Sequence, residues 1–151
     1  IKQFFVGGPN SLRAWRLREL GAGGDTEYIL GLQDVPPFAS GDFKLDFSAE
    51  YRFKLFWLMD GAVFLDAGNV WALKGETGDI RKLGPDFLKQ IAVGTGWGLR
   101  FDLTYFILRF DMGYKLRNPF PDPETGSYSA FNSKYNSFPL GNINFAINYP
   151  F

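Results

Sequence analysis

The stretch that decides the fold reads Asp42-Phe43-Lys44-Leu45-Asp46-Phe47-Ser48-Ala49-Glu50-Tyr51-Arg52-Phe53-Lys54. Apolar residues occupy every odd position in it, and polar or charged residues occupy every even position. This two-residue period predicts a β-strand whose two faces meet different surroundings. Strands of soluble proteins average ~5–6 residues, so a strand over the whole of 42–54 is unusually long.

The same period returns four more times along the chain. The further strands are predicted at 57–71, 90–102, 105–116 and 142–151, separated by short turns at 55–56 and 103–104 and by long polar loops at 72–89 and 117–141. Strands of ~9–11 residues can cross a bilayer at a tilt, and short turns on one side with long loops on the other are typical of outer-membrane barrels. We therefore expect an all-β fold: an antiparallel meander of about five strands that forms the C-terminal part of a transmembrane β-barrel.

The alternative is a soluble antiparallel barrel with its apolar faces turned inward. Every strand carries large aromatic residues on its apolar face, and a small core would have difficulty holding all of them. Lipid around the apolar faces and water around the charged ones removes this difficulty. Aromatic residues near the strand ends predict two interfacial girdles. They are Tyr51, Phe53, Trp57, Trp71, Phe101, Tyr105, Tyr149 and Phe151.

About five strands cannot close a membrane barrel, since the smallest have ~8. An open strand edge in lipid would leave backbone groups without hydrogen-bond partners. We therefore expect the first strand to pair with strands outside this sequence: either the chain is the C-terminal part of a larger barrel, or several chains combine. The chain begins with Ile1 and shows no signal peptide, so we expect it to be a processed or excised piece of a longer protein.

Composition narrows the possible functions. The 16 basic and 16 acidic residues balance, which gives no reason to expect nucleic acid as a partner. Cysteine and histidine are both absent, which excludes disulfides, thiolate or histidine metal sites and His-dependent nucleophiles. The sequence contains no run of ~18 apolar residues, so it predicts no transmembrane helix.

Two patterns could suggest chemistry, and both have a better structural explanation. Acidic residues on the predicted strands could be imagined as a catalytic carboxylate pair, but scattered acids of this kind in barrels are usually structural. They are Glu50, Asp60, Asp66 and Asp111. The glycines of Gly94-x-Gly96-x-Gly98 lie within a strand with no helix after it, so they do not predict a nucleotide site; they leave space for a loop or for strand curvature. We expect no enzyme activity, metal or cofactor.

Several segments resemble the BamA/TamA family of outer-membrane proteins, also called the bacterial surface antigen family. The loop Phe4-Phe5-Val6-Gly7-Gly8-Pro9-Asn10-Ser11-Leu12-Arg13-Ala14-Trp15 resembles a family loop with a hydrophobic-Arg-Gly-aromatic core, except that Ala14 replaces the glycine. Phe64-Leu65-Asp66-Ala67-Gly68-Asn69-Val70-Trp71 resembles the family's Asp-x-Gly-x-x-Trp strand, and Ser48-Ala49-Glu50-Tyr51-Arg52-Phe53 resembles the strand before it. The last strand resembles the family's terminal assembly signal through Phe145, Ile147, Tyr149 and Phe151. The form Leu-Arg-Ala-Trp is most similar to Bacteroidetes members.

The resemblance implies two regions and one contact between them. Residues 1–41 would correspond to the sixth extracellular loop, folded into the lumen as a plug, and residues 42–151 to the C-terminal barrel strands. Arg13 would meet Asp66, with Glu50 on the neighbouring strand, because a guanidinium offers a fork of donors to carboxylates. The alternative is that Arg13 is a solvated loop residue. The loop motif would also include Gly7, Gly8, Leu12, Ala14 and Trp15, with the two glycines allowing a tight bend.

The resemblance also implies a function. The protein would fold and insert other β-barrels in the outer membrane of a Gram-negative bacterium, through a weak seam whose edge templates a client strand. Pro150 removes one backbone donor near that seam. Expected partners are outer-membrane lipids, client β-barrel proteins, and the missing N-terminal strands and POTRA repeats. The alternatives are a secretion or passive pore of the same fold, of the two-partner secretion type, and an unrelated small barrel acting as an adhesin or lipid enzyme.

Overall fold

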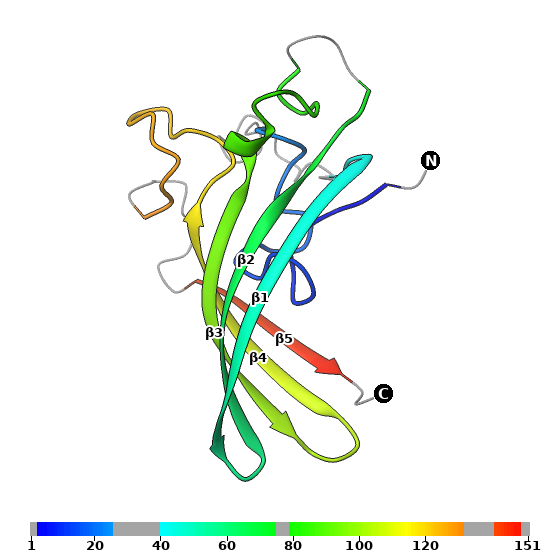
Figure 1. The fold of residues 1–151 in the computed structure, drawn as a ribbon, viewed down its shortest axis with the longest axis vertical. Helices are drawn as coiled ribbons and strands as arrows, with labels where there is room; N and C mark the ends of the chain where they lie inside the picture. Colours follow the sequence, from blue (N-terminus) through cyan, green and yellow to red (C-terminus); the bar gives the residue numbers. More distant parts are fainter. Residues whose placement is uncertain (1–2, 26–39, 75–78, 132–140, 149–151) are drawn as a thin grey trace.

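The chain folds as one curved antiparallel sheet with a loop against one face (Figure 1). The structure, a computed structural model, describes residues 3–25, 40–74, 79–131 and 141–148. The strands are β1 (Phe43–Phe56), β2 (Met59–Trp71), β3 (Ala92–Asp102), β4 (Ile107–Arg117) and β5 (Asn142–Asn148), and they lie in the sheet in that order. The all-β antiparallel meander predicted from the sequence is confirmed.

The sheet is open at both edges within the described part of the chain. There β1 pairs only with β2, and β5 pairs only with β4. The observed sheet is thus part of a barrel wall and not a closed barrel. None of the described segments forms a helix long and apolar enough to cross a bilayer.

Strand boundaries differ from the predicted ones at the turns. β1 continues to Phe56, and a register shift after Lys54 moves the turn from the predicted 55–56 to Trp57-Leu58. β4 begins at Ile107, because residues 103–106 form a tight turn in which Thr104 has a φ of 72°. The side-chain period does not detect such local changes in backbone path. The last three residues of the predicted final strand lie outside the described residues.

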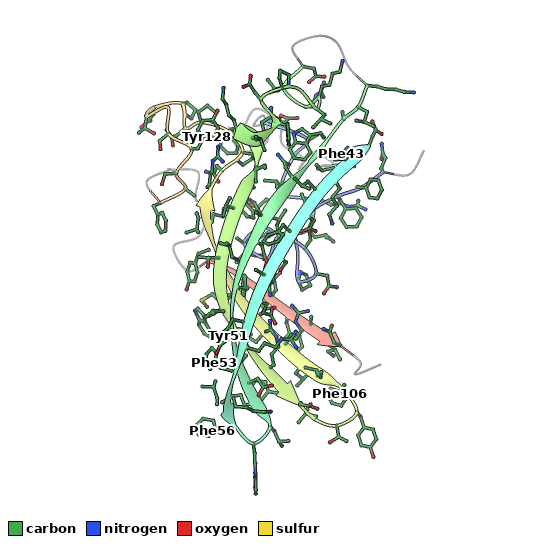
Figure 2. The ribbon with its side chains drawn as sticks, viewed as in Figure 1. Phe43, Tyr51, Phe53, Phe56, Phe106 and Tyr128 are labelled. Atoms are coloured by element: carbon green, nitrogen blue, oxygen red, sulfur yellow. The ribbon has the colours of Figure 1, made fainter. Side chains whose placement is uncertain are left out.

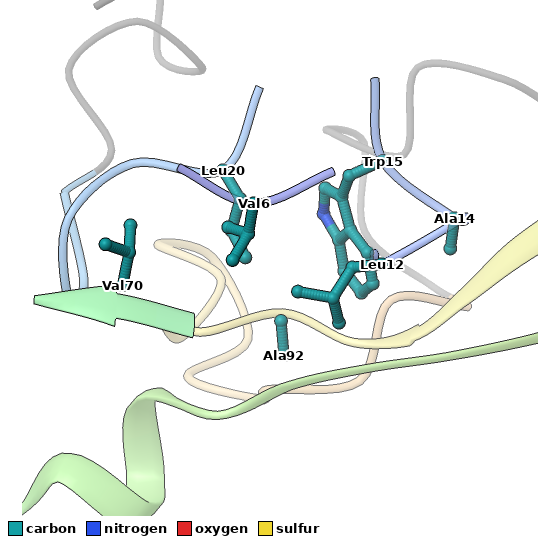
Figure 3. Packing of buried hydrophobic residues seen from close by; sticks show 7 residues of the cluster. All are labelled: Val6, Leu12, Ala14, Trp15, Leu20, Val70 and Ala92. Carbon is teal, nitrogen blue, oxygen red and sulfur yellow. The ribbon is translucent and has the colours of Figure 1, made fainter. Parts of the chain in front are cut away.

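The two faces of the wall have opposite surroundings. The apolar side chains of β1 and β5 are exposed; Tyr51, Phe53 and Phe56 follow one another toward the β1–β2 turn (Figure 2). The buried apolar cluster lies between the loop and the other face of the sheet (Figure 3). It consists of Val6, Leu12, Ala14, Trp15, Leu20, Val70 and Ala92. A soluble barrel with inward apolar faces does not describe this arrangement, because most large apolar side chains of the strands point away from the covered side.

The prediction that Trp71 belongs to an aromatic girdle is wrong. Its side chain has no exposed surface, and its ring contacts Phe43 and Phe87. Its indole Nε1 donates a hydrogen bond to Gln90 Oε1 at 2.8 Å. The loop after β2 folds over the end of the strand, so Trp71 belongs to a loop contact and not to an exposed ring of aromatic residues.

The orientation of the wall can be tested with spin labels in the full-length protein in lipid vesicles. Labels at Phe47 and Phe145, which are 59% and 63% exposed on the apolar face, should be reached by lipid-soluble quenchers. A label at Arg52, on the polar face of β1, should respond to an aqueous quencher. The reverse pattern would mean that the apolar face is not the lipid-facing one.

Candidate functional site

The site is built around Arg13, the residue of the loop that reaches farthest into the polar face of the sheet. Its guanidinium forms a two-pronged contact with Asp66 on β2: Nε donates to Oδ2 at 2.9 Å and Nη2 donates to Oδ1 at 2.7 Å. The backbone N–H of Arg13 also donates to Oδ2, at 3.0 Å. Arg13 is 3% exposed and Asp66 is fully buried, so the contact is shielded from water. The two side-chain hydrogen bonds make it a bidentate arginine–carboxylate pair, a strong type of charged hydrogen bond.

Strand β1 completes the surroundings of the guanidinium. Arg13 Nη1 donates to Glu50, and Nη2 donates to Ser48 Oγ at 3.0 Å. Ser48 Oγ in turn donates to Asp66 Oδ1 at 2.7 Å. The structure therefore brings together the three residues predicted to meet, Arg13, Asp66 and Glu50, and adds Ser48 to them.

The cation also stacks on an aromatic ring. The guanidinium carbon of Arg13 lies 3.5 Å from the centre of the Phe64 ring, which points to the polar face of β2. Burial disfavours the charge of Arg13. Hydrogen bonds and attraction from Asp66 and Glu50 outweigh that effect, so the pKa of the Arg13 guanidinium is raised above its usual value. Arg13 thus stays charged while the ring covers one face of its guanidinium.

A second layer of charges lies on the wall beside this contact. Arg100 on β3 donates to Glu50 at 2.9 Å and to Asp111 on β4 at 2.5 Å. Arg109 donates to Asp111 at 3.1 Å and to the carbonyl of Pro9 at 3.2 Å. The chain of contacts therefore begins in the loop at Arg13, crosses three strands and returns to the loop at Pro9. Asp111 thus pairs with two arginines, Arg100 and Arg109.

The loop motif fits against glycines of the wall. Leu12, Ala14 and Trp15 are buried. A Cβ on Gly94 would lie 2.6 Å from the Cβ of Ala14, and a Cβ on Gly113 would lie 2.7 Å from the carbonyl of Arg13. These positions must stay small because the side chains of Ala14 and Trp15 pack on Gly94 of β3, and the backbone of Arg13 lies on Gly113 of β4.

The bend of the loop depends on Gly7 and Gly8, as the sequence predicts. Their φ angles are 100° and 85°, which favour glycine. A Cβ on Gly7 would lie 2.1 Å from the carbonyl oxygen of Arg16. The bend is closed by hydrogen bonds from the Gly8 N–H to the Trp15 carbonyl at 2.9 Å and from the Arg18 N–H to the Val6 carbonyl at 3.1 Å.

Comparison with protein families assigns this arrangement to a known group. Residues 1–123 match the Omp85 superfamily domain. The chain belongs to the Omp85 superfamily. Proteins of this superfamily are outer-membrane β-barrel proteins, and membership supports a barrel-assembly or secretion type of function in general. No curated protein and no solved structure matches the chain.

Other contacts of this Omp85 chain were not expected from its sequence. Asn69 of the strand motif is buried and donates to the carbonyls of Gly23 and Gln90, at 2.8 Å and 2.6 Å. Lys115 donates to Glu19 at 2.7 Å. These contacts hold the second half of the loop to the wall. Lys115 shares the inward-facing side of β4 with Asp111. Asn69 lies opposite Leu45, on the side that alternation assigns to the apolar face, so no pattern in the sequence identifies its contact with the loop.

The residues of the terminal strand are split between described and undescribed positions. Phe145 and Ile147 are exposed on the apolar face of β5. Tyr149 and Phe151 lie outside the described residues. No group of three or more acidic side chains in the described ranges is arranged to hold a metal ion.

The buried ion pair predicts a large cost for removing Arg13. Arg13→Ala should lower the free energy of unfolding of the full-length barrel by ~3–5 kcal/mol, because Asp66 would remain buried without its cation. Arg13→Lys should recover only part of this loss, since lysine lacks the planar fork. Urea denaturation in lipid vesicles measures the change. Arg16→Ala, at an exposed position of the same loop, is the control; an equal loss there would refute the assignment.

The close contact between Gly94 and Ala14 predicts that a substitution at one position can offset the loss of stability caused by a substitution at the other. Gly94→Ala should destabilise the protein by ~1–3 kcal/mol through overpacking against Ala14. Adding Ala14→Gly should restore part of this loss; the rescue is partial because a Cβ at position 94 would also lie 3.0 Å from the Trp15 ring. Gly84→Ala is the matched control, since the nearest atom there is 3.9 Å away. Strict additivity of the two substitutions, measured by the same denaturation, would contradict direct contact.

Proposed function

We propose that this chain is the C-terminal barrel part of a BamA/TamA-like factor that folds and inserts other β-barrel proteins in the outer membrane of a Gram-negative bacterium. The main support is the loop held on the polar face of an Omp85 wall by the buried Arg13 cluster. We propose a physical mechanism and no enzymatic step. A Bacteroidetes origin stays a prediction that rests on Leu12-Arg13-Ala14-Trp15.

The proposed working element is the edge of the last strand. Apart from its pairing with β4, β5 has no strand neighbour in the described part of the chain. A strand edge carries backbone donors and acceptors that can pair with an incoming strand, and strand addition is a general mode of peptide recognition. A client strand would pair there while Ile143 and Ile147, both 55% exposed, face lipid. In the complete protein, N-terminal barrel strands and POTRA repeats would supply the other side of the seam and the delivery of clients.

The docked loop would keep the lumen filled while the seam opens. Residues 3–25 cover the polar face of the wall and bury the apolar cluster against it. A barrel with an open seam and an empty lumen would leak water and ions. A loop fixed to the wall by buried charges would let the seam open while the loop still fills the lumen.

A secretion pore of the same superfamily is the second candidate. It is favoured by charges of both signs on the polar face, such as Arg52 and Asp60, which suit a water-filled passage. In that case the loop would have to leave the lumen to open the path. The two candidates therefore differ in what happens when the plug is loosened.

Depletion and complementation in cells can separate the two functions. Cells depleted of the protein should lose folded, heat-modifiable outer-membrane barrels, and the wild-type full-length gene should restore them. Arg13→Ala should restore them poorly, and Arg16→Ala should restore them fully. If folded barrels are unchanged on depletion while a soluble passenger stops appearing outside the cells, the assembly function is wrong and the secretion function is supported.

A further inference from the structure

Arg13 is held from both ends by opposite edges of the sheet. Its side chain contacts β1 and β2, as described above. Its backbone carbonyl accepts hydrogen bonds from β5: Asn144 Nδ2 donates at 2.8 Å and Asn142 Nδ2 donates at 3.0 Å. One residue of the loop therefore joins the first two strands of this sheet to the last one.

The two asparagines form a defined pair on the inner face of β5. Asn142 Nδ2 also lies 3.4 Å from Asn144 Oδ1, so the oxygen of Asn144 accepts while its nitrogen donates to the loop. Asn144 is 8% exposed. Opposite Asn142 on β4 lies Gly113, whose missing Cβ allows the Arg13 carbonyl to come this close.

The loss of these contacts would affect both partners. If the loop left the wall, Asn144 would lose the Arg13 carbonyl, the acceptor of its Nδ2 hydrogen bond. If β5 moved, the Arg13 carbonyl would lose both donors. By thermodynamic linkage, anything that favours the docked loop must then favour the present position of β5, and the reverse.

We propose that Asn142 and Asn144 are positioning residues that couple the docking of the loop to the position of the last strand. The loop thereby restrains the strand whose edge forms one side of the seam. The consequence for client assembly rests on the function proposed above, whereas the coupling itself does not.

Hydrogen–deuterium exchange of the full-length protein in lipid vesicles tests the coupling. The double variant Asn142→Ala/Asn144→Ala should increase the exchange rate of β5 backbone amides by about tenfold, as expected for losing buried hydrogen bonds. Alanine is chosen over aspartate because Asn144 lies opposite Asp111, where a second negative charge would repel. Asn148→Ala is the matched control: it lies on the same strand and the same face, opposite Ile107. Equal acceleration by the control would overturn the proposal.

Repeating the experiment in an Asp66→Ala variant separates coupling between the loop and β5 from packing within β5 alone. With the loop loosened by Asp66→Ala, the double alanine variant should cause a smaller further acceleration of β5 exchange, because coupled contacts do not contribute additively. The same tenfold increase in that background would show that the asparagines act only within β5, and would overturn the proposal. Asn144→Gln, which keeps a donor, should recover part of the wild-type exchange rate.

Because linkage is reciprocal, loosening β5 should also loosen the loop. This effect can be measured without the Asp66 variant. A single cysteine at Asn10, in a sequence without native cysteine, should react faster with a water-soluble thiol reagent when both asparagines are alanine. An unchanged rate, with faster β5 exchange, would contradict linkage between loop and strand. If both readouts change while the amount of folded client barrels in cells does not, the coupling stands but does not limit client assembly; the assembly function itself fails only if depletion leaves folded barrels unchanged.

Discussion

The structure depends on the burial of one cation. Arg13 is nearly inaccessible to water, and an isolated charge in that position would be prohibitively costly. The charge is tolerable only where Asp66 and Glu50 approach together from two paired strands and the fork of donors meets both. This requirement fixes the position of the loop on the wall, and the apolar contacts of Leu12 and Trp15 follow from it.

The second constraint is space. A loop that packs its backbone onto a sheet needs positions without side chains, and Gly94 and Gly113 supply them on neighbouring strands. Ala14 stands where the resembling family has glycine, and its methyl group occupies the room left by Gly94. The wall therefore combines two kinds of inner residue, charged ones that hold the loop and glycines that let it approach. Most of its large apolar residues lie on the other face and are exposed there.

The two-residue period predicted the strands and their faces, because it assigns each residue to a side. The members of the central contact, Arg13, Asp66 and Glu50, were predicted from the resemblance to the BamA/TamA family. The period did not predict which residues on the same side would touch. Arg100 and Asp111 both lie at polar positions of alternating strands, but their pairing depends on the register of β3 against β4 and on how their side chains extend along the wall. Phe64 lies at an even position of β2, as Asp60 and Asp66 do, and the period gives no reason for an aromatic residue there; the stacked guanidinium provides it. Trp71 was misplaced because the path of the loop covering it leaves no periodic signal.

The sequence separations within the site imply an order of assembly. The contacts of Arg13 join residues 37, 53 and 131 positions apart, so none of them helps the loop to find its place early. The carboxylates come into position once β1 and β2 pair, whereas the donors to the Arg13 carbonyl arrive only with β5, the last strand. Loop docking is therefore complete only when the sheet is complete in the correct register. A shift of β5 by one residue would turn Asn144 away from the loop and direct apolar side chains toward it. The docked loop thus selects the one register in which the last strand presents its asparagines inward and its apolar residues outward.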